Sequence, residues 1–177
     1  TPSVISGRNQ DAALEADLEY AEQHGIQVFH RLTGGGAVYH DPGNVNCTVF
    51  SDMPGEDAFS LKKLAEPVAE AVRTVLPEVH FGGRNDLLTG DGRKICGTAA
   101  RIDGTRVLFH CCINYDVDME VMEHVLTPSV TKLERHAVRS VKSRTVRLRE
   151  FMPDTDTDAF MDLMERELLR IISGEKI

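Results

Sequence analysis

The sequence predicts a mixed α/β fold, of the α+β type, in which a largely antiparallel sheet is flanked by helices. Strand-like and helical segments do not alternate regularly along the chain, as they would in a doubly wound parallel fold. The dipeptide Asp103-Gly104 separates two strand-like runs and is a strong signal for a two-residue hairpin turn. Residues 156–172 place apolar side chains on one helical face, which is typical of a helix that covers a core. With 177 residues, the chain has the length of a single domain.

The first half of the chain is expected to combine short strands with one helix. Asp11 can cap a helix, and Gly25 lies just past its expected end. Apolar and polar side chains alternate over 45–51, as they do in a half-buried strand. The elements expected here are a strand ending at Val4-Ile5, a helix over 11–23, and strands over 27–32 and 45–51.

The second half is expected to begin with a helix that Ser60 caps and that runs toward Leu76. Pro67 should break or kink this helix, because proline cannot donate a backbone hydrogen bond. The remaining elements expected are short strands over 79–81 and 87–88, hairpin strands over 94–102 and 106–115, and helices over 119–126 and 156–172.

The composition argues against several classes of protein. A net charge of −8 is unsuited to general nucleic-acid binding, which relies on an excess of Lys and Arg. No apolar run approaches the roughly 20 residues that cross a bilayer, and no signal peptide opens the chain, so we expect no membrane partner. The four cysteines show no zinc spacing, and adjacent Cys111 and Cys112 should point to opposite faces of a strand. We therefore expect reduced thiols and a cytoplasmic protein.

The segment Arg31-Leu-Thr-Gly-Gly-Gly-Ala-Val-Tyr-His-Asp41 is the most informative part of the sequence. Three glycines can present several N–H groups to one anion, because glycine tolerates positive φ and close backbone approach. Arg31 can add charge-assisted hydrogen bonds to a phosphate or carboxylate. The triplet by itself fits a tight hairpin corner about equally well. Two more polar clusters, over 83–87 and 94–99, favour an active centre that handles a nucleotide.

At these residues the chain resembles the lipoate–protein ligases, within the wider biotin/lipoate ligase superfamily. The matching blocks are Ile5–Gln10, Arg31–Asp41, Gly43–Asn46, Gly83–Leu87, Lys94–Ala99, His110 and Ser140–Arg144. The likeness runs from about residue 2 to about residue 150, and the number of ordered blocks makes it specific. Two departures are His30, in place of the first arginine of the family's pair, and Thr33, in place of the usual serine. The biotin ligases' Gly-Arg-Gly-Arg-Arg-Gly loop is absent from the sequence.

The resemblance implies an ATP-dependent enzyme that activates lipoate as lipoyl-AMP and transfers it to an acceptor lysine. The implied cofactors are ATP and Mg²⁺, and the implied acceptors are lipoyl domains of 2-oxo acid dehydrogenases or the glycine-cleavage H protein. It also implies that Lys94 is the catalytic cation that touches both the lipoyl carboxylate and the α-phosphate. Fixed charges of this kind stabilise the negative charge that accumulates in both transition states.

The other implied site residues divide by ligand. The ATP-binding residues would be Arg31, Gly34, Gly35, Gly36, Ala37, Val38, Tyr39, Asn85 and Lys94. The lipoate-binding residues would be Arg31, Gly35, Lys94 and His110, and the metal ligand would be Asp86. Other interpretations remain open: Asn85 and Asp86 also suit a tight turn, and a strand histidine such as His110 is often a core residue.

Two rival functions stay open. In related octanoyl and lipoyl transferases, a nucleophilic cysteine stands at about the place of Asn85, so this residue argues against a cysteine-dependent transferase. Cys96, Cys111 and Cys112 are read as small buried residues. The other rival is a non-catalytic half of a split ligase. We expect residues 1–177 to form a single catalytic domain without the family's N-terminal segment and C-terminal accessory domain. The basic segment 139–149 is either a solvated face or a loop that covers the adenylate.

Overall fold

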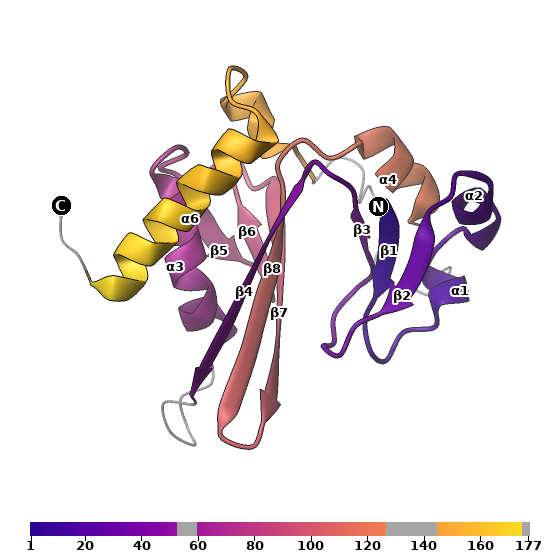
Figure 1. Ribbon diagram of the computed structural model, residues 1–177, viewed down its shortest axis with the longest axis horizontal. Coiled ribbons are helices and arrows are strands. Elements are labelled where there is room, and N and C mark those ends of the chain that lie inside the picture. Colours follow the sequence, from indigo (N-terminus) through magenta and orange to yellow (C-terminus); the bar gives the residue numbers. More distant parts are fainter. Residues whose placement is uncertain (53–59, 127–144, 175–177) are drawn as a thin grey trace.

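The computed structural model describes residues 1–52, 60–126 and 145–174. Its strands form two sheets that stand side by side, each with its own helices (Figure 1). The expected mixed and largely antiparallel architecture is confirmed, but the strands divide between two sheets where one was expected. None of the described helices combines the length and apolar character that a bilayer crossing requires.

The small-sheet half contains the N-terminal strands and the helices that pack on them. Its strand order is β2-β1-β3, with β1 parallel to β2 and antiparallel to β3. The strands are β1 (Ser3–Ser6), β2 (Gln27–His30) and β3 (Val38–His40), and the helices are α1 (Ala12–Glu15), α2 (Leu18–Gln23) and α4 (Met119–Val125). Val4, Tyr39 and Val125 are buried in the core between them.

The prediction of a single helix over 11–23 is wrong, because the chain forms two short helices there. Asp11 caps the first helix as expected. Ala16 then adopts an extended conformation (φ −136°, ψ 146°), and the Asp17 side chain accepts from Tyr20 N to cap the second helix. The N–H of Asp17 donates to Val125 O at 2.9 Å. A competing cap and a bond to α4 therefore override the local helical pattern.

The large-sheet half contains five antiparallel strands in the order β4-β8-β7-β6-β5. They are β4 (Asn44–Asp52), β5 (His80–Gly82), β6 (Asp86–Leu88), β7 (Lys94–Asp103) and β8 (Arg106–Asn114). The hairpin predicted around Asp103-Gly104 joins β7 to β8, with Asp103 opposite Arg106. Gly104 has a φ of 58°, the conformation that this tight turn requires.

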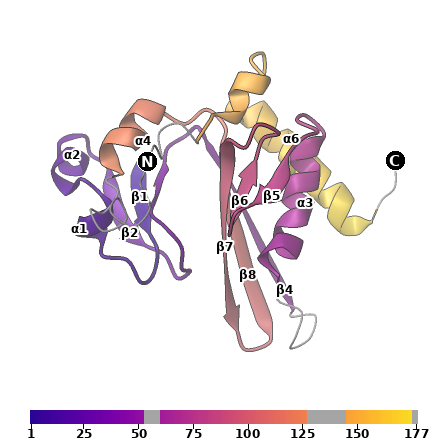
Figure 2. The same cartoon turned by 180° about the vertical axis from the view of Figure 1, so that it is seen from behind.

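Helices α3 (Leu61–Arg73) and α6 (Thr157–Ser173) cover the face of the large sheet that points away from the small sheet, as Figure 2 shows from behind. The 3-10 helix η1 (Leu148–Phe151) precedes α6. Tyr115 and Phe160 stack in this core with ring centroids 4.2 Å apart. Pro67 does not break α3. Apolar residues are buried on both sides of it, among them Ala65 and Val68, and this packing holds the helix together.

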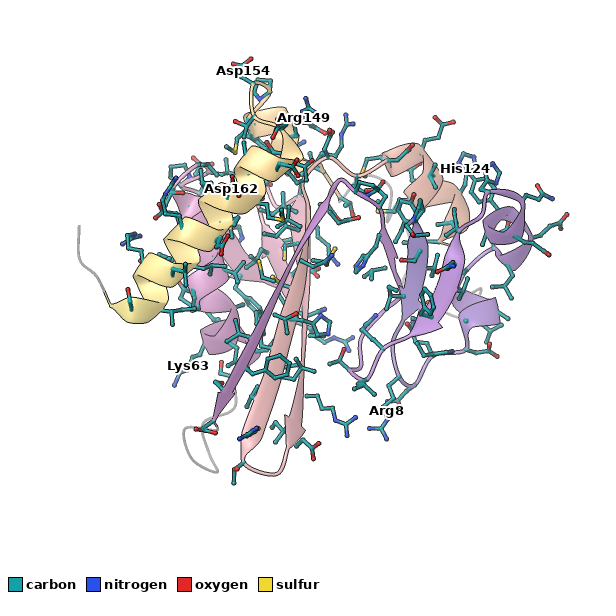
Figure 3. The ribbon with its side chains drawn as sticks, viewed as in Figure 1. Arg8, Lys63, His124, Arg149, Asp154 and Asp162 are labelled. Carbon is teal, nitrogen blue, oxygen red and sulfur yellow. The ribbon has the colours of Figure 1, made fainter. Side chains whose placement is uncertain are left out.

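A short segment around Gly43 connects the two halves. Asp116 N donates to Gly43 O at 2.8 Å, and a Cβ on Gly43 would lie 2.2 Å from Asp116 O. Asp41 Oδ2 accepts from Asp118 N at 2.8 Å. These bonds fix the angle at which β4 leaves β3. Figure 3 shows Arg8 at the open end of the space between the halves, whereas Lys63 and Asp162 lie on the outer helices.

Candidate active site

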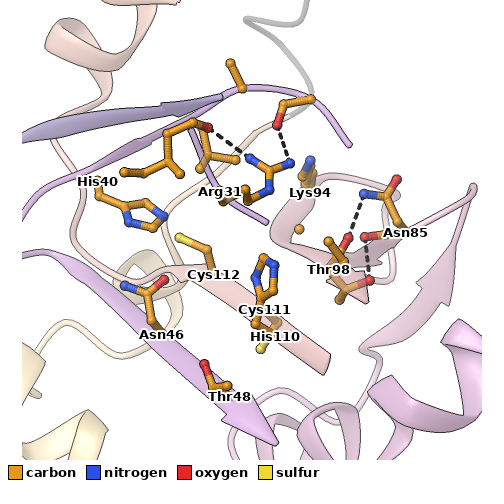
Figure 4. Close-up of a pocket in the computed structure, with 16 residues that line it drawn as sticks. Arg31, His40, Asn46, Thr48, Asn85, Lys94, Thr98, His110, Cys111 and Cys112 are labelled. Carbon is orange, nitrogen blue, oxygen red and sulfur yellow. Dashed lines mark hydrogen bonds between the residues drawn. The ribbon is translucent and has the colours of Figure 1, made fainter. Parts of the chain in front are cut away.

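A cavity of about 360 Å³ lies between the two sheets, and Figure 4 shows the side chains that line it. The small-sheet half contributes Ile5, Arg31, Gly36, Ala37, Val38 and His40. The large-sheet half contributes Asn46, Thr48, Asn85, Lys94, Gly97, Thr98, Ala99, His110, Cys111 and Cys112. Motifs that are far apart in the sequence therefore meet around one space.

Strand register builds the wall that the large sheet presents to this cavity. One row across the strands consists of Asn46, Cys112, Gly97 and Asp86. A second row, two residues further along, consists of Thr48, His110 and Ala99. The alternation that predicted β4 has thus placed its polar side chains toward the cavity, while its apolar side chains pack beneath α3 and α6.

The guanidinium of Arg31 holds the glycine loop, which we define as residues 33–37. Nη2 donates to Gly34 O and to Gly36 O, each at 2.7 Å. Nη1 donates to Ile5 O at 2.9 Å. Nε donates to Thr33 Oγ1 at 3.0 Å. Four of its five N–H groups are thereby used within the protein. Burial lowers the pKa of Arg31 from its usual value.

Two glycines make this arrangement possible. Gly35 has a φ of 96°, and a Cβ there would lie 2.9 Å from Arg31 Nη2. A Cβ on Gly7, in the first matching block, would lie 2.2 Å from Gly35 O. Both positions therefore exclude a side chain. With the carbonyls of Gly34 and Gly36 turned toward Arg31, the N–H groups of residues 34–36 have no protein acceptor among the described residues.

Lys94 begins β7 and lies at the centre of the cavity wall. Its Nζ forms an ion pair with Asp86 Oδ1 at 2.9 Å, and both side chains are largely buried. A Cβ on Gly97 would lie 3.3 Å from this Nζ, so the glycine leaves the space that the lysine occupies. Val146 N donates to Lys94 O at 2.9 Å, which fixes the backbone on the other side. The ammonium therefore has a defined position in the cavity.

Asp86 contacts Lys94, and its role as a metal ligand stays a prediction. No group of three or more His, Cys, Asp or Glu residues among the described ones is arranged to hold a metal. Mg²⁺ often binds through one or two protein oxygens together with substrate phosphates, so a single carboxylate is compatible with it. The donor chemistry of Asp86 therefore fits a magnesium ion that a nucleotide carries into the site.

Asn85 and Thr98 hold each other through three hydrogen bonds, drawn in part in Figure 4. Asn85 Nδ2 donates to Thr98 O at 2.9 Å. Thr98 N and Thr98 Oγ1 donate to Asn85 O at 2.8 and 3.0 Å. The amide nitrogen is thus engaged, and the amide oxygen is the part of Asn85 that can accept a bond from a ligand or contact a metal.

Two histidines line the cavity from opposite walls. His110 Nε2 lies 2.6 Å from Thr33 Oγ1, which joins β8 to the glycine loop. Burial, and then the charge of Arg31, lower the pKa of His110. The pKa of His40 is also lowered, first by burial and then by Arg31 and His110. Both imidazoles are therefore neutral at physiological pH, which suits hydrogen bonding to a ligand better than charge neutralisation.

The adjacent Cys111 and Cys112 lie on opposite faces of β8, as predicted. Cys96 and Cys111 belong to the buried core beneath the helices. Cys112 shares the cavity-facing row with Gly97, and its Sγ accepts from Asn44 Nδ2 at 3.4 Å. Burial raises the pKa of Cys112 to about 12. A thiol with this pKa is protonated at neutral pH and is a poor nucleophile.

Two hollows adjoin the cavity and account for the remaining predicted residues. Gly34 and Gly35 border an open hollow together with Arg84 and Asn85. Tyr39 borders a smaller hollow of about 110 Å³, whose wall includes Lys94, Met122 and Leu126. Lys94 therefore lies where this smaller hollow meets the main cavity.

The basic segment is only partly visible, because residues 139–144, and with them the block Ser140–Arg144, lie outside the described residues. Arg147 and Arg149 each form an ion pair with Asp116. These two arginines therefore point to a carboxylate on the loop after β8, and neither lines the main cavity.

Sequence reasoning missed several residues that line the cavity. His40 is part of the segment Arg31–Asp41, and its place in that segment was the available signal. Asn46 belongs to the matching block Gly43–Asn46 but was given no role, and Thr48 was seen only as a polar residue of an alternating strand. Thr98 carries no signal in a single sequence, because its role depends on pairing with Asn85.

Comparison with protein-family models matches residues 1–169 to the lipoyl protein ligase A/B catalytic domain. A lipoate–protein ligase from Streptococcus pyogenes is 39% identical, over 96% of this chain and 51% of the relative. The lipoate-protein ligase LplJ of Bacillus subtilis is 36% identical, over 88% and 47%. The human mitochondrial lipoyl amidotransferase LIPT1 is 32% identical, over 94% and 44%. The chain thus spans about half the length of these relatives.

Solved structures show the same fold. A bi-partite lipoate protein ligase from Thermoplasma acidophilum, studied with its E2 lipoyl domain, matches with a TM-score of 0.77 and 29% identity over 98% of this chain and 67% of its own. A T. acidophilum protein with bound lipoic acid matches with a TM-score of 0.79 and 27% identity, over 98% and 68%. A lipoate-protein ligase A bound with ATP matches with a TM-score of 0.73 and 26% identity, over 98% and 68%.

Proposed function

The chain belongs to the lipoyl protein ligase A/B catalytic-domain family, and from this premise we propose that it performs ATP-dependent ligation of lipoate to protein. The observation that carries the proposal is the position of Lys94. Its ammonium lies where the main cavity meets the hollow beside Tyr39, next to the glycine loop. One cation can thus reach an acyl carboxylate in the cavity and the α-phosphate of a nucleotide whose base lies in this hollow.

In the first step, a carboxylate oxygen of lipoate attacks the α-phosphorus of ATP, and the bond to the β-phosphate oxygen breaks. Lipoyl-AMP forms and pyrophosphate leaves. Lys94 neutralises the charge that grows on the phosphate and acyl oxygens, which is a large electrostatic contribution in a partly desolvated site. Its partner Asp86, at 2.9 Å, directs the ammonium in the resting protein.

The nucleotide would lie along the glycine loop. The hollow bordered by Val38, Tyr39, Met122 and Leu126 offers apolar contacts for the adenine. Gly34, Gly35 and Gly36 line a second hollow together with Arg84, and their N–H groups, which have no acceptor among the described residues, suit the phosphates. When a magnesium ion accompanies the phosphates, Asp86 and the amide oxygen of Asn85 would hold it, and it would add positive charge at the phosphate oxygens.

In the second step, the amine of an acceptor lysine attacks the acyl carbon, the acyl–phosphate bond breaks, and AMP leaves as the amide forms. A lipoyl domain is the proposed acceptor, since a ligase of this fold was studied with its E2 lipoyl domain. The glycine-cleavage H protein is a second proposed acceptor. All four cysteines are free thiols, which agrees with action in a reducing compartment such as the cytosol.

A second candidate is amidotransfer, in which the acyl group comes from another acylated protein without ATP. The observation that favours it is the 32% identity with the human lipoyl amidotransferase. A third is that the chain binds ligands but needs a second component for turnover, as the existence of a bi-partite ligase of this fold suggests.

ATP–pyrophosphate exchange with lipoate separates these candidates. Lipoate-dependent exchange, followed by transfer to a lipoyl domain, would support the ligase. ATP-independent transfer from an acylated donor protein would support amidotransfer. Binding of lipoate without either reaction would show that this chain alone is not the catalyst.

A further inference from the structure

The hydrogen bonds of Thr33 determine which nitrogen of His110 carries the proton. Thr33 is 2% exposed, and its hydroxyl contacts Arg31 Nε at 3.0 Å and His110 Nε2 at 2.6 Å. Arginine can only donate, so the hydroxyl oxygen accepts from Arg31. The hydroxyl proton then has one acceptor among the described residues, which is His110 Nε2.

The opposite arrangement would leave a buried donor unsatisfied. If His110 Nε2 donated to Thr33, the hydroxyl proton would have no acceptor in the described structure, which is costly for a buried group. A charged imidazolium is disfavoured as well, because burial and Arg31 lower the pKa of His110. His110 is therefore the neutral form that carries its proton on Nδ1.

The donor on Nδ1 is available to a ligand. No described residue forms a hydrogen bond with this atom, and His110 lines the cavity. His110 also lies two residues from Cys112 along β8, and Cys112 is opposite Gly97, over which Lys94 lies. His110 is thus a diagonal neighbour of Gly97 across β8 and β7, and such neighbours lie about 7–8 Å apart. The donor is therefore about this far from the place where the carboxylate would meet Lys94.

The acyl chain of lipoate has a matching dimension. An extended carbon chain advances roughly 1.25 Å per bond, from a bond length near 1.52 Å and an angle near 111°. Its first ring carbon, the sixth atom of the chain, is then about 6.3 Å from the carboxyl carbon. That carbon bears a sulfur, which is a weak hydrogen-bond acceptor, whereas octanoate has only a methylene there.

We propose that Thr33 is a positioning residue that fixes His110 as an Nδ1–H donor, and that this donor meets the dithiolane sulfur and makes the cavity favour lipoate over octanoate. The proposal deepens the proposed function and rests on it for the identity of the acyl ligand. Thr33 acts here through His110, and Arg31 holds the Thr33 oxygen in place.

The test uses two matched variants and no ATP. Thr33→Val keeps the shape and removes the hydroxyl, whereas Thr33→Ser keeps the hydroxyl. Nitrogen NMR of the histidine rings should give an Nδ1–H signature for His110 in the wild type and in Thr33→Ser, and loss of it in Thr33→Val. Calorimetry gives the affinities for lipoate and for octanoate, and their ratio measures the preference for lipoate. This ratio should fall about threefold in Thr33→Val and stay unchanged in Thr33→Ser.

Several results would overturn the proposal. The first is an Nε2–H signature of His110 in the wild type, which can be measured without any variant. The second is a ratio of lipoate to octanoate affinity that is unchanged in Thr33→Val. The third is the same NMR signature and the same affinity ratio in Thr33→Val and Thr33→Ser. A wild type that binds neither acid would overturn it together with the proposed function. Binding with the expected ratio and no pyrophosphate exchange would contradict the proposed function alone.

Discussion

The two halves of the molecule contribute to the cavity in different ways. The large sheet contributes side chains, among them Lys94 and His110, that project from strands whose register is fixed by long ladders. The small-sheet half contributes mainly backbone. Its glycine loop has few side chains, and the guanidinium of Arg31 is turned toward the carbonyls of that loop. A substitution on the large sheet should therefore change chemistry with little effect on folding. A substitution in the glycine loop should change conformation first and chemistry as a consequence.

The largest effect is expected from Lys94→Ala on the large sheet. Removal of a fixed cation from a partly buried site should lower the rate of lipoyl-AMP formation by roughly 10²-fold, or about 3 kcal/mol. Lys94→Arg should rescue poorly, since a planar guanidinium does not replace a compact ammonium between two oxygens. The measurement is pyrophosphate release with lipoate, and Lys63→Ala on the exposed side of α3 is the control. Near-normal adenylation by Lys94→Ala would show that another group is the catalytic cation.

The matching change in the small-sheet half is Gly35→Ala. A Cβ would meet Arg31 Nη2 at 2.9 Å and would be strained at a φ of 96°. Backbone strain of this kind costs on the order of 1–3 kcal/mol, so the loop should shift and adenylation should fall more than tenfold. Gly25→Ala is the control, because Gly25 also has positive φ but lies in open space near α2. Thermal unfolding should change similarly in both variants, whereas adenylation should fall only in Gly35→Ala. Equal activities would show that the loop is only a turn.

Arg31→Lys tests whether the cation of the small-sheet half acts through structure. An ammonium cannot bond the carbonyls of Ile5, Gly34 and Gly36 in the geometry of the guanidinium. The expected result is a loss of about 2 kcal/mol in the free energy of unfolding, from two or three lost charge-assisted bonds that are partly replaced. Urea unfolding measures this loss, and Arg8→Lys on the neighbouring exposed loop should change little. A normally stable Arg31→Lys variant with impaired ATP binding would instead favour direct contact with the phosphates.

The smallest effect is expected from Cys112→Ala. A pKa of about 12 keeps this thiol protonated at neutral pH, so an acyl thioester is not needed for the proposed reaction. ATP-dependent lipoylation should stay within about threefold of the wild type, since the change removes only a small buried group. Mass spectrometry of the wild type with acyl donor gives the second readout. A thioester on Cys112, lost together with activity in the variant, would support a cysteine-dependent transferase.

Much of the large-sheet half was predictable because its signals are local. The alternation over β4 and the Asp103-Gly104 turn predicted strands that the structure contains. The small-sheet half was harder to predict. The helix expected over 11–23 is divided in two, and a hydrogen bond joins Asp17 at the division to Val125, more than 100 residues away. No local pattern reports such a bond. The same holds for Pro67, whose helix is kept intact by packing on both sides.

The sequence by itself determined the fold class, the family and the residues around which the site would form, because motif residues and turn signals act over a few positions. Only the tertiary structure decided what those residues contact. It turned Arg31 toward the carbonyls of its own loop, paired Lys94 with Asp86, and placed Thr33 against His110. It also directed the polar side of β4 into the cavity. These outcomes depend on strand register and on the close approach of two sheets, and both are set by packing between segments that are distant in the chain.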